Sequence, residues 1–255
     1  MMVPESSAVT IADLERETFR IAEQSARKGL LVRTFGSLAV RLIARSQTAM
    51  LDRLRPLPKD IDLITLPFDM MRCRELLRES DWTDADDTVV FSEGLKLSMR
   101  HMKLGINLDV YPATLGFNQR LDLRDRLVLS FPTITPSDLL LTKIQILRPT
   151  LSDIVDTSAL LLSCPLGTDD ASHLSTPRIS SVLRKSWRWR WAVRNWWKQL
   201  TAMDFVACGF SKTESTSMLE AALCLITSLG SATGPSTSFA DRFRCLLIKP
   251  FTVPE

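Results

Sequence analysis

The chain has 255 residues, of which 45% are hydrophobic and 24% are charged. This composition supplies enough apolar surface for a sizeable core and excludes a disordered chain, while the length allows one large domain or two small ones. The formal net charge of +3 is too small to indicate a nucleic-acid-binding protein by itself.

The N-terminal half shows alternating helical and strand patterns. Its first helix has clear ends, because Thr10 and Asp13 have the spacing of a capping box and Gly29 can terminate the helix. Apolar runs bounded by glycine or proline indicate strands, and apolar residues at helical spacing indicate helices. In chain order, the expected elements are a helix at 10–29, a strand at 30–35, a helix at 38–54, a strand at 60–66, a helix at 69–80, and strands at 87–91, 95–102 and 105–113.

The C-terminal half has mostly helical spacing. Thr135 can cap the first of these helices, Pro136 suits its first turn and Asp138 is favourable near its N-terminus. The expected helices are 136–148, 151–163, 178–200 and 214–229. The predicted fold class is therefore α+β, with a mixed sheet flanked by helices in a domain at 1–134 and a helical domain at 135–255.

Cysteine and hydropathy patterns bear on the cellular setting. The five cysteines are widely scattered and, with only two histidines, do not indicate a zinc site. The N-terminal residues lack the segments of a signal peptide, and no apolar run is long enough to cross a bilayer. We therefore expect a reduced, cytoplasmic protein with no membrane partner.

Three aspartates occupy alternating positions of expected strands. Asp60 and Asp62 lie on one face of the strand at 60–66, and Asp109 repeats this pattern in the strand at 105–113. If the two strands are neighbours, three carboxylates share one face and raise one another's pKa. A hard divalent cation such as Mg²⁺ removes this repulsion, and two-metal sites use such carboxylates for displacement at phosphorus.

A Gly-Ser turn precedes the helix at 38–54. Gly36 and Ser37 would leave free backbone N–H groups and a hydroxyl where a phosphate can dock. A short Asp-x-Asp stretch or a Gly-Ser turn alone is also common in proteins without such a site. The order of these features along the chain therefore carries the prediction of a phosphate and metal site.

This order resembles the DNA polymerase β-type nucleotidyltransferase superfamily. The matching stretches are "FGS" at 35–37, "KDIDLI" at 59–64 and "INLDVY" at 106–111. The segment "TPSDLLLTKIQILRPTLSDIVDTSALL" at 135–161 resembles the segment after the core in AbiEii-type nucleotidyltransferases, the toxin class of abortive-infection systems. There a Lys, an Arg and a pair of Asp residues line the site, and the residues that match in order are Lys143, Arg148, Asp153 and Asp156.

The resemblance implies transfer of an NMP from an NTP to an acceptor hydroxyl. It implies that Asp60 and Asp62 hold two Mg²⁺ ions, and that Asp109 ligates the catalytic ion and helps to activate the acceptor hydroxyl. It assigns triphosphate binding to Gly36, Ser37 and Lys143. The alternative for Lys143 is an ordinary solvated residue on a helix. It also leaves open an antitoxin protein as a partner. Ser152 departs from the pattern, in which a Lys is common.

The stretch "RKSWRWRWAVRNWWKQL" is rich in tryptophan and basic residues. No acidic residue occurs from Ala171 to Met203, whereas seven basic ones do. On one continuous helix, Arg184, Trp187, Trp191, Arg194 and Lys198 would share a face. Cations interleaved with aromatics suit RNA, since phosphates take the charge and bases stack on indoles. The alternatives are tryptophans packed in the core while the cations extend to solvent, and a helix lying on a membrane surface.

These features predict an Mg²⁺-dependent nucleotidyltransferase whose acceptor is tRNA or another RNA, with a toxin-like role as one possibility. Two other classes stay open. One is a non-catalytic module that binds RNA or a protein partner, and the other is a small-molecule nucleotidyltransferase of the antibiotic-modifying type.

Overall fold

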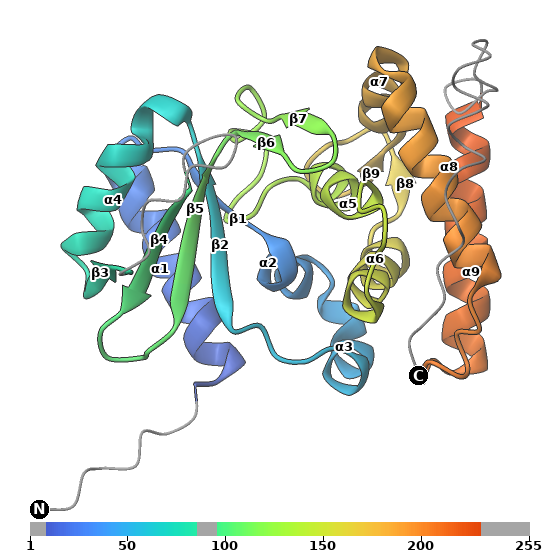
Figure 1. Ribbon diagram of the computed structural model, residues 1–255, viewed down its shortest axis with the longest axis horizontal. Helices are drawn as coiled ribbons and strands as arrows, with labels where there is room; N and C mark the ends of the chain where they lie inside the picture. Colours follow the sequence, from blue (N-terminus) through green and yellow to red (C-terminus); the bar gives the residue numbers. More distant parts are fainter. Residues whose placement is uncertain (1–8, 86–95, 231–255) are drawn as a thin grey trace, which may run out of the picture.

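A five-stranded mixed sheet forms the centre of the N-terminal half in the computed structural model, which describes residues 9–85 and 96–230 (Figure 1). The strand order is β1-β2-β5-β4-β3, in which β2 and β5 are parallel and the other neighbouring pairs are antiparallel. Their bounds are Val32–Phe35 for β1, Asp60–Thr65 for β2, Trp82–Asp84 for β3, Leu97–His101 for β4 and Asn107–Pro112 for β5. An α+β fold with a mixed sheet followed by a largely helical part is confirmed.

Most of the expected strands are present in the sheet. Those expected at 30–35, 60–66, 95–102 and 105–113 are confirmed as β1, β2, β4 and β5. The strand expected at 87–91 lies outside the described residues. Strand β3 was missed because it has only three residues, too few for an alternating pattern to be recognised.

Helices α1 and α4 cover one face of the sheet (Figure 1). α1 spans Ile11–Arg27 and α4 spans Met70–Arg78. The expected capping box is confirmed, since Thr10 accepts a hydrogen bond from the Asp13 N–H and the Asp13 carboxylate accepts one from the Thr10 N–H. Ile61 and Leu63 of β2 pack beneath these helices, which turns the alternate residues of β2 to the opposite face.

The single helix expected at 38–54 is wrong, because the chain forms two helices with a turn between them. α2 covers Gly36–Ile43, a 3-10 turn η1 covers Arg45–Gln47 and α3 covers Thr48–Leu54. In one straight helix, Arg41 and Asp52 would lie about 16 Å apart along the axis, at a rise of 1.5 Å per residue. The turn instead brings the buried guanidinium of Arg41 to 2.6 Å from the Asp52 carboxylate.

The C-terminal half is built of helices, with small strand pairs at its edges. The helices are Pro136–Ile144 for α5, Leu151–Ser163 for α6, Thr176–Lys185 for α7, Trp187–Ala202 for α8 and Lys212–Leu229 for α9. The small strands are Thr114–Gly116 for β6 and Arg120–Asp122 for β7, which precede these helices in the chain, and Leu166–Gly167 for β8 and Leu174–Ser175 for β9. In the N-terminal half, the 3-10 turn η2, Pro67–Asp69, directly precedes α4. Helix α6 has its expected range. Helix α5 ends at Ile144 and not at residue 148 as expected, and the Leu147 carbonyl beyond it accepts hydrogen bonds from Asn195 and Gln199 of α8.

One hydrophobic cluster joins the sheet to the helical half. It includes Phe35 of β1, Ile64 of β2 and residues of every helix from α5 to α9, ending at Leu229. The boundary expected between residues 134 and 135 therefore crosses a shared core, and separate folding of the two parts stays a prediction. Within the described ranges, no helix combines the length and the apolar character needed to cross a bilayer.

The single helix expected at 178–200 is also wrong, because the chain breaks at Ser186. This residue has extended backbone angles, φ −152° and ψ 134°, and its hydroxyl accepts a hydrogen bond from the Arg188 N–H at the start of α8. Trp189, Trp196 and Leu200 of α8 are buried in the core. Because Arg184 belongs to α7, the five residues expected to share one helix face do not do so.

Candidate functional site

The three aspartates singled out in the sequence lie on one face of the sheet. β2 and β5 are neighbouring parallel strands, in which Asp62 is the register partner of Asp109 and Asp60 is the partner of Asn107. The expectation that these strands are adjacent and place their carboxylates on the same side is thus met. Asp60 is exposed, whereas Asp62 and Asp109 are half-buried.

The position of Asp62 is electrostatically unfavourable for a carboxylate. Burial raises the pKa of Asp62, and the negative charges of Asp60 and Asp109 raise it further, to about 7. Positive charge on Lys143 and Lys96 offsets only part of this effect. A cation bound beside these carboxylates would therefore stabilise the folded protein.

Asp109 is held by two residues of the neighbouring β4 edge that sequence reasoning did not identify. Lys96 lies 2.6 Å from one carboxylate oxygen, and the hydroxyl of Ser98 donates to the other at 2.6 Å. Ser98 is the register partner of Asp109, so it faces the same side of the sheet. The alternation of Lys96 and Ser98 along their strand was a usable signal, because both point to the carboxylate face.

The donor set on this face is the one expected from the sequence to hold two Mg²⁺ ions. Its chemistry fits, since Mg²⁺ prefers carboxylate oxygens and three carboxylates share this face. Over residues 9–85 and 96–230, however, no three His, Cys, Asp or Glu side chains converge closely enough to hold a metal ion. Lys96 and Ser98 also engage both oxygens of Asp109, so they would compete with a metal ion for this carboxylate.

Gly36 brings the start of α2 against Asp62. Its φ is +72°, and a Cβ atom at this position would lie 2.1 Å from Oδ2 of Asp62. Only glycine therefore permits both the backbone angle and the close approach. No side chain caps α2, so the first N–H groups of the helix, beside Ser37, are available to an anion.

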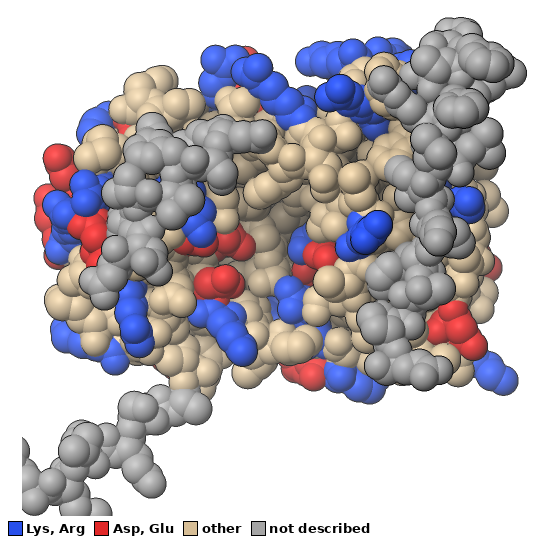
Figure 2. Space-filling model, viewed as in Figure 1, with Lys and Arg blue, Asp and Glu red and all other residues tan. Residues whose placement is uncertain are grey.

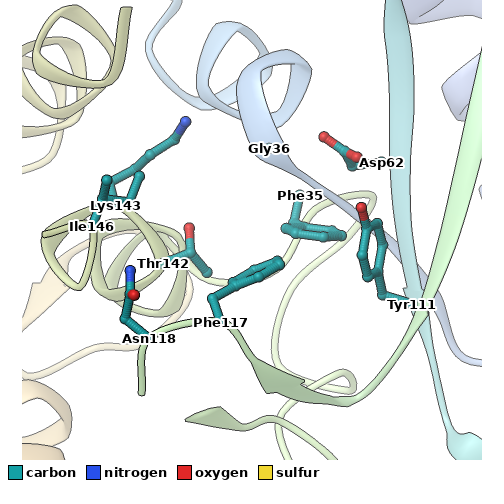
Figure 3. Close-up of a pocket in the computed structure, with 9 residues that line it drawn as sticks. All are labelled: Phe35, Gly36, Asp62, Tyr111, Phe117, Asn118, Thr142, Lys143 and Ile146. Atoms are coloured by element: carbon teal, nitrogen blue, oxygen red, sulfur yellow. The ribbon is translucent and has the colours of Figure 1, made fainter. Parts of the chain in front are cut away.

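A pocket of about 360 Å³ connects the carboxylate face to helix α5 (Figure 3). Phe35, Tyr111 and Phe117 form an aromatic wall, with ring centroids 5.2 Å apart for Phe35 and Tyr111 and 6.0 Å apart for Tyr111 and Phe117. Figure 2 shows the corresponding hollow between the sheet and the helical half, with acidic side chains at its rim. The full lining is Phe35, Gly36, Asp62, Tyr111, Phe117, Asn118, Thr142, Lys143 and Ile146.

Lys143 lies across this pocket from Asp62 (Figure 3). Its side chain is 11% exposed, and its ammonium group lies 2.8 Å from Asp156 and 3.2 Å from Asp153. Burial lowers the pKa of Lys143, but the charges of Asp156 and Asp153 outweigh burial and leave this pKa above its usual value. Lys143 is therefore a buried, charged residue and not an ordinary solvated one.

The other residues matched in the segment at 135–161 have different environments. Asp156 is buried and also accepts a hydrogen bond at 3.0 Å from Arg55, a residue that sequence reasoning did not identify. Asp153 completes the cluster around Lys143 and caps α6 with Thr150. Arg148 is exposed and is not among the residues lining the pocket.

Replacing Lys143 with Met is expected to lower the free energy of unfolding by about 1–3 kcal/mol, because the buried Asp156 loses the nearer of its cations while Arg55 remains. Thermal melts of the purified variant measure this change. Lys103→Met is the matched control, since its ion pair with Asp81 is largely exposed and contributes little. Equal melting temperatures for Lys143→Met and the wild type would contradict the stabilising role of this cluster.

The tryptophan-rich segment presents a mixed surface. Trp187, Trp191 and Arg194 of α8 are half-buried, whereas Lys198 of α8 and Arg184 of α7 are exposed. The guanidinium of Arg188 lies 5.7 Å from the centre of the Trp187 ring. Stacking of these indoles on nucleic-acid bases stays a prediction.

No protein-family model matches the chain, and no curated protein is significantly similar to it in sequence. A functional assignment therefore depends on the pocket residues and their contacts.

Proposed function

We propose that the protein is an Mg²⁺-dependent nucleotidyltransferase of the DNA polymerase β type, which transfers an NMP from an NTP to an acceptor hydroxyl. One observation carries this proposal. Asp62 and Asp109 lie side by side on parallel strands, with the Gly36 turn against Asp62 and Lys143 across the pocket. This arrangement supplies oxygen ligands for metal, backbone N–H groups for phosphate and a positive charge facing both.

In this proposal Asp60, Asp62 and Asp109 would provide the ligands for two Mg²⁺ ions after their side chains move closer together and Asp109 is released from Lys96 and Ser98. When bound, Mg²⁺ would supply positive charge to neutralise the phosphate oxygens during displacement. Asp109, once released from Lys96 and Ser98, would also accept the proton of the acceptor hydroxyl.

The remaining pocket residues would hold the nucleotide. The N–H groups of α2 and the hydroxyl of Ser37 bind the triphosphate, and Lys143 adds a positioned charge. The aromatic wall of Phe35, Tyr111 and Phe117 offers an apolar surface for a base or a ribose. Such positioning and electrostatic stabilisation are the main contributions that a protein makes to this type of reaction.

The acceptor in the proposal is RNA, such as tRNA. Support comes from the cations and indoles of α7 and α8, including Trp187 and Trp191, which lie partly in solvent. A toxin-like role with an antitoxin partner rests on the resemblance of residues 135–161 and belongs to the proposal in the same way. The cytoplasmic setting also belongs to the proposal and rests on the scattered cysteines.

The test is incubation of the protein with each α-³²P-labelled NTP, Mg²⁺ and total cellular RNA, followed by gel electrophoresis. One NTP is expected to label an RNA band, and chelation of Mg²⁺ or the Asp109→Asn substitution should remove the label. A labelled small molecule in place of RNA would favour the antibiotic-modifying class. No labelled product from any NTP would refute nucleotidyl transfer under these conditions.

A second candidate function is nucleotide binding without transfer. The observation that favours it is the engagement of both Asp109 oxygens by Lys96 and Ser98. Equilibrium dialysis with each NTP separates the two candidates, since a binding module would retain NTP and yield no labelled product.

Replacing both Trp187 and Trp191 with Ala is expected to weaken RNA binding about tenfold, because stacking contributes roughly 1–3 kcal/mol per base. Fluorescence anisotropy with labelled RNA measures the change. Trp197→Ala is the matched control, because Trp197 is also half-buried on α8 but packs against the core. RNA affinity that is the same in the double variant and the control would locate the RNA surface elsewhere.

A further inference from the structure

A groove leads away from the candidate site along the β6–β7 hairpin. Phe117 and Asn118 line both the pocket beside Asp62 and a second pocket of about 550 Å³. Arg120 lines this second pocket and also a third one of about 190 Å³. Because neighbouring pockets share these residues, the three lie next to one another between the carboxylate face and the junction of α7 and α8.

The third pocket, at the far end of this groove, is rich in cations. Arg120 of β7 and Lys185 of α7 are exposed at its mouth, and the acidic residue beside them, Asp122, is paired with Arg124 at 2.6 Å. Figure 2 shows Lys and Arg side chains gathered along the upper edge of the molecule, over β7 and α7. The pocket is therefore suited to an anion.

Arg178 in the wall of the third pocket has an unused hydrogen-bond donor. Its side chain is 10% exposed, and its Nε donates to Asp138 at 2.8 Å. Among the described residues, its Nη2 atom has no hydrogen-bond partner. A buried charged donor without a partner is destabilising, and a phosphate oxygen would satisfy it after a rotation of the guanidinium toward the pocket that Arg178 lines.

The N-terminus of α8 adds to the positive electrostatic potential of the third pocket. Ser186, which caps this 16-residue helix, lines the third pocket. The positive end of the helix dipole therefore lies at the pocket, where it favours an anion.

We propose that the third pocket binds a phosphate group of a single-stranded nucleic acid, whose chain follows the groove past Arg188 to Phe117 and the candidate site. Phosphate matches the planar guanidinium of Arg178 and the cations at the mouth. Phe117, which is 50% exposed, offers its ring to an unpaired base. Only the further step, in which this strand is the acceptor, rests on the proposed nucleotidyl transfer.

The test measures binding of a labelled single-stranded RNA oligonucleotide by anisotropy over a salt series, with neither NTP nor Mg²⁺ present. The double variant Arg120→Ala/Lys185→Ala is expected to bind about tenfold more weakly, and its salt slope should fall by about 0.7 for each phosphate that is no longer neutralised. Arg16→Ala/Arg27→Ala, which removes two exposed cations from α1, is the matched control and should bind as the wild type does.

Arg178→Lys tests the buried donor directly. Lysine keeps the positive charge beside Asp138 but removes the planar guanidinium and its free N–H. We expect a several-fold loss of affinity with the thermal melt little changed. If this variant does not fold, the double variant still decides the matter, since its residues are exposed. Wild-type affinity and an unchanged salt slope in the double variant would overturn the proposal.

Two further measurements separate related outcomes. In the first, inorganic phosphate raises the melting temperature of the wild type but not of Arg178→Lys, while the pocket variants bind the oligonucleotide as the wild type does. This result would overturn the assignment of the pocket to a nucleic-acid strand. Pocket-dependent binding in a protein that transfers no nucleotide would support the phosphate site and refute the proposed reaction.

Discussion

Asp62→Asn is expected to abolish nucleotidyl transfer while leaving the protein at least as stable as the wild type in the presence of a chelator. Loss of a positioned charged group in such a site lowers the rate by about 10²–10³-fold or more. Stability should not fall, because Asp62 is a half-buried carboxylate beside Asp60 and Asp109, and the variant relieves their repulsion. Transfer assays and thermal melts of the same preparations measure the two effects.

The stability difference between Asp62→Asn and the wild type should depend on pH. The pKa of Asp62 is raised from 3.8 to about 7 by burial and by its two acidic neighbours. Between these values the unfolded chain has lost the proton that the folded chain retains, so rising pH destabilises the folded wild type. The advantage of Asp62→Asn in melting temperature should therefore grow from about pH 4 to pH 7 and level off above it.

A control with the opposite sign is available in the same chain. Asp138 is also buried, but Arg126 and Arg178 contact its carboxylate, and the Thr135 hydroxyl donates to it. Asp138→Asn should lower the melting temperature at pH 7, because Arg178 loses its counter-charge and Arg126 keeps only Asp170. If Asp62→Asn also melts below the wild type at pH 7, Asp62 has a stabilising structural role and the electrostatic account is wrong.

The parts of the site that follow from local patterns were predictable from the sequence. Strand alternation placed Asp60, Asp62 and Asp109 on one face, because a side chain on a strand can point only to one side or the other. The capping residues Thr10 and Thr135 were likewise recognisable, since a cap is made by residues three apart in the chain.

The parts that depend on distant contacts were not predictable. Arg55 and Asp156 are far apart in sequence, and nothing in the residues around Arg55 indicates their ion pair. Both helix errors have a related cause, since apolar spacing continues across a break that tertiary contacts impose. Ser186 interrupts a favourable helical pattern because α7 and α8 pack separately into the core.

Gly36→Ala is expected to remove both transfer activity and a large part of the stability. A φ of +72° disfavours any residue with a Cβ by roughly 1–2 kcal/mol. The added methyl group would also lie 2.1 Å from Oδ2 of Asp62, so the carboxylate must move away from the start of α2. Because Asp62 and the α2 N–H groups act together in the proposed site, this displacement should lower transfer about as much as Asp62→Asn does.

Gly105→Ala separates the two causes of destabilisation. Gly105 has a similar φ of +66°, but a Cβ atom there meets nothing within 4 Å. It should therefore show the backbone cost alone and keep full activity. Gly36→Ala should lower the free energy of unfolding more than Gly105→Ala does. This extra loss of stability should shrink when Asp62 is replaced by Ala, because the atom nearest to the new methyl group is then Cβ of residue 62, at 3.2 Å. Denaturant melts are measured for Gly36→Ala, Gly105→Ala, Asp62→Ala and the double variant Gly36→Ala/Asp62→Ala. The last variant, compared with its two single variants, gives the coupling energy between Gly36 and Asp62. Additive effects of Gly36→Ala and Asp62→Ala would show that the glycine is needed only for its backbone angle and not to admit the carboxylate.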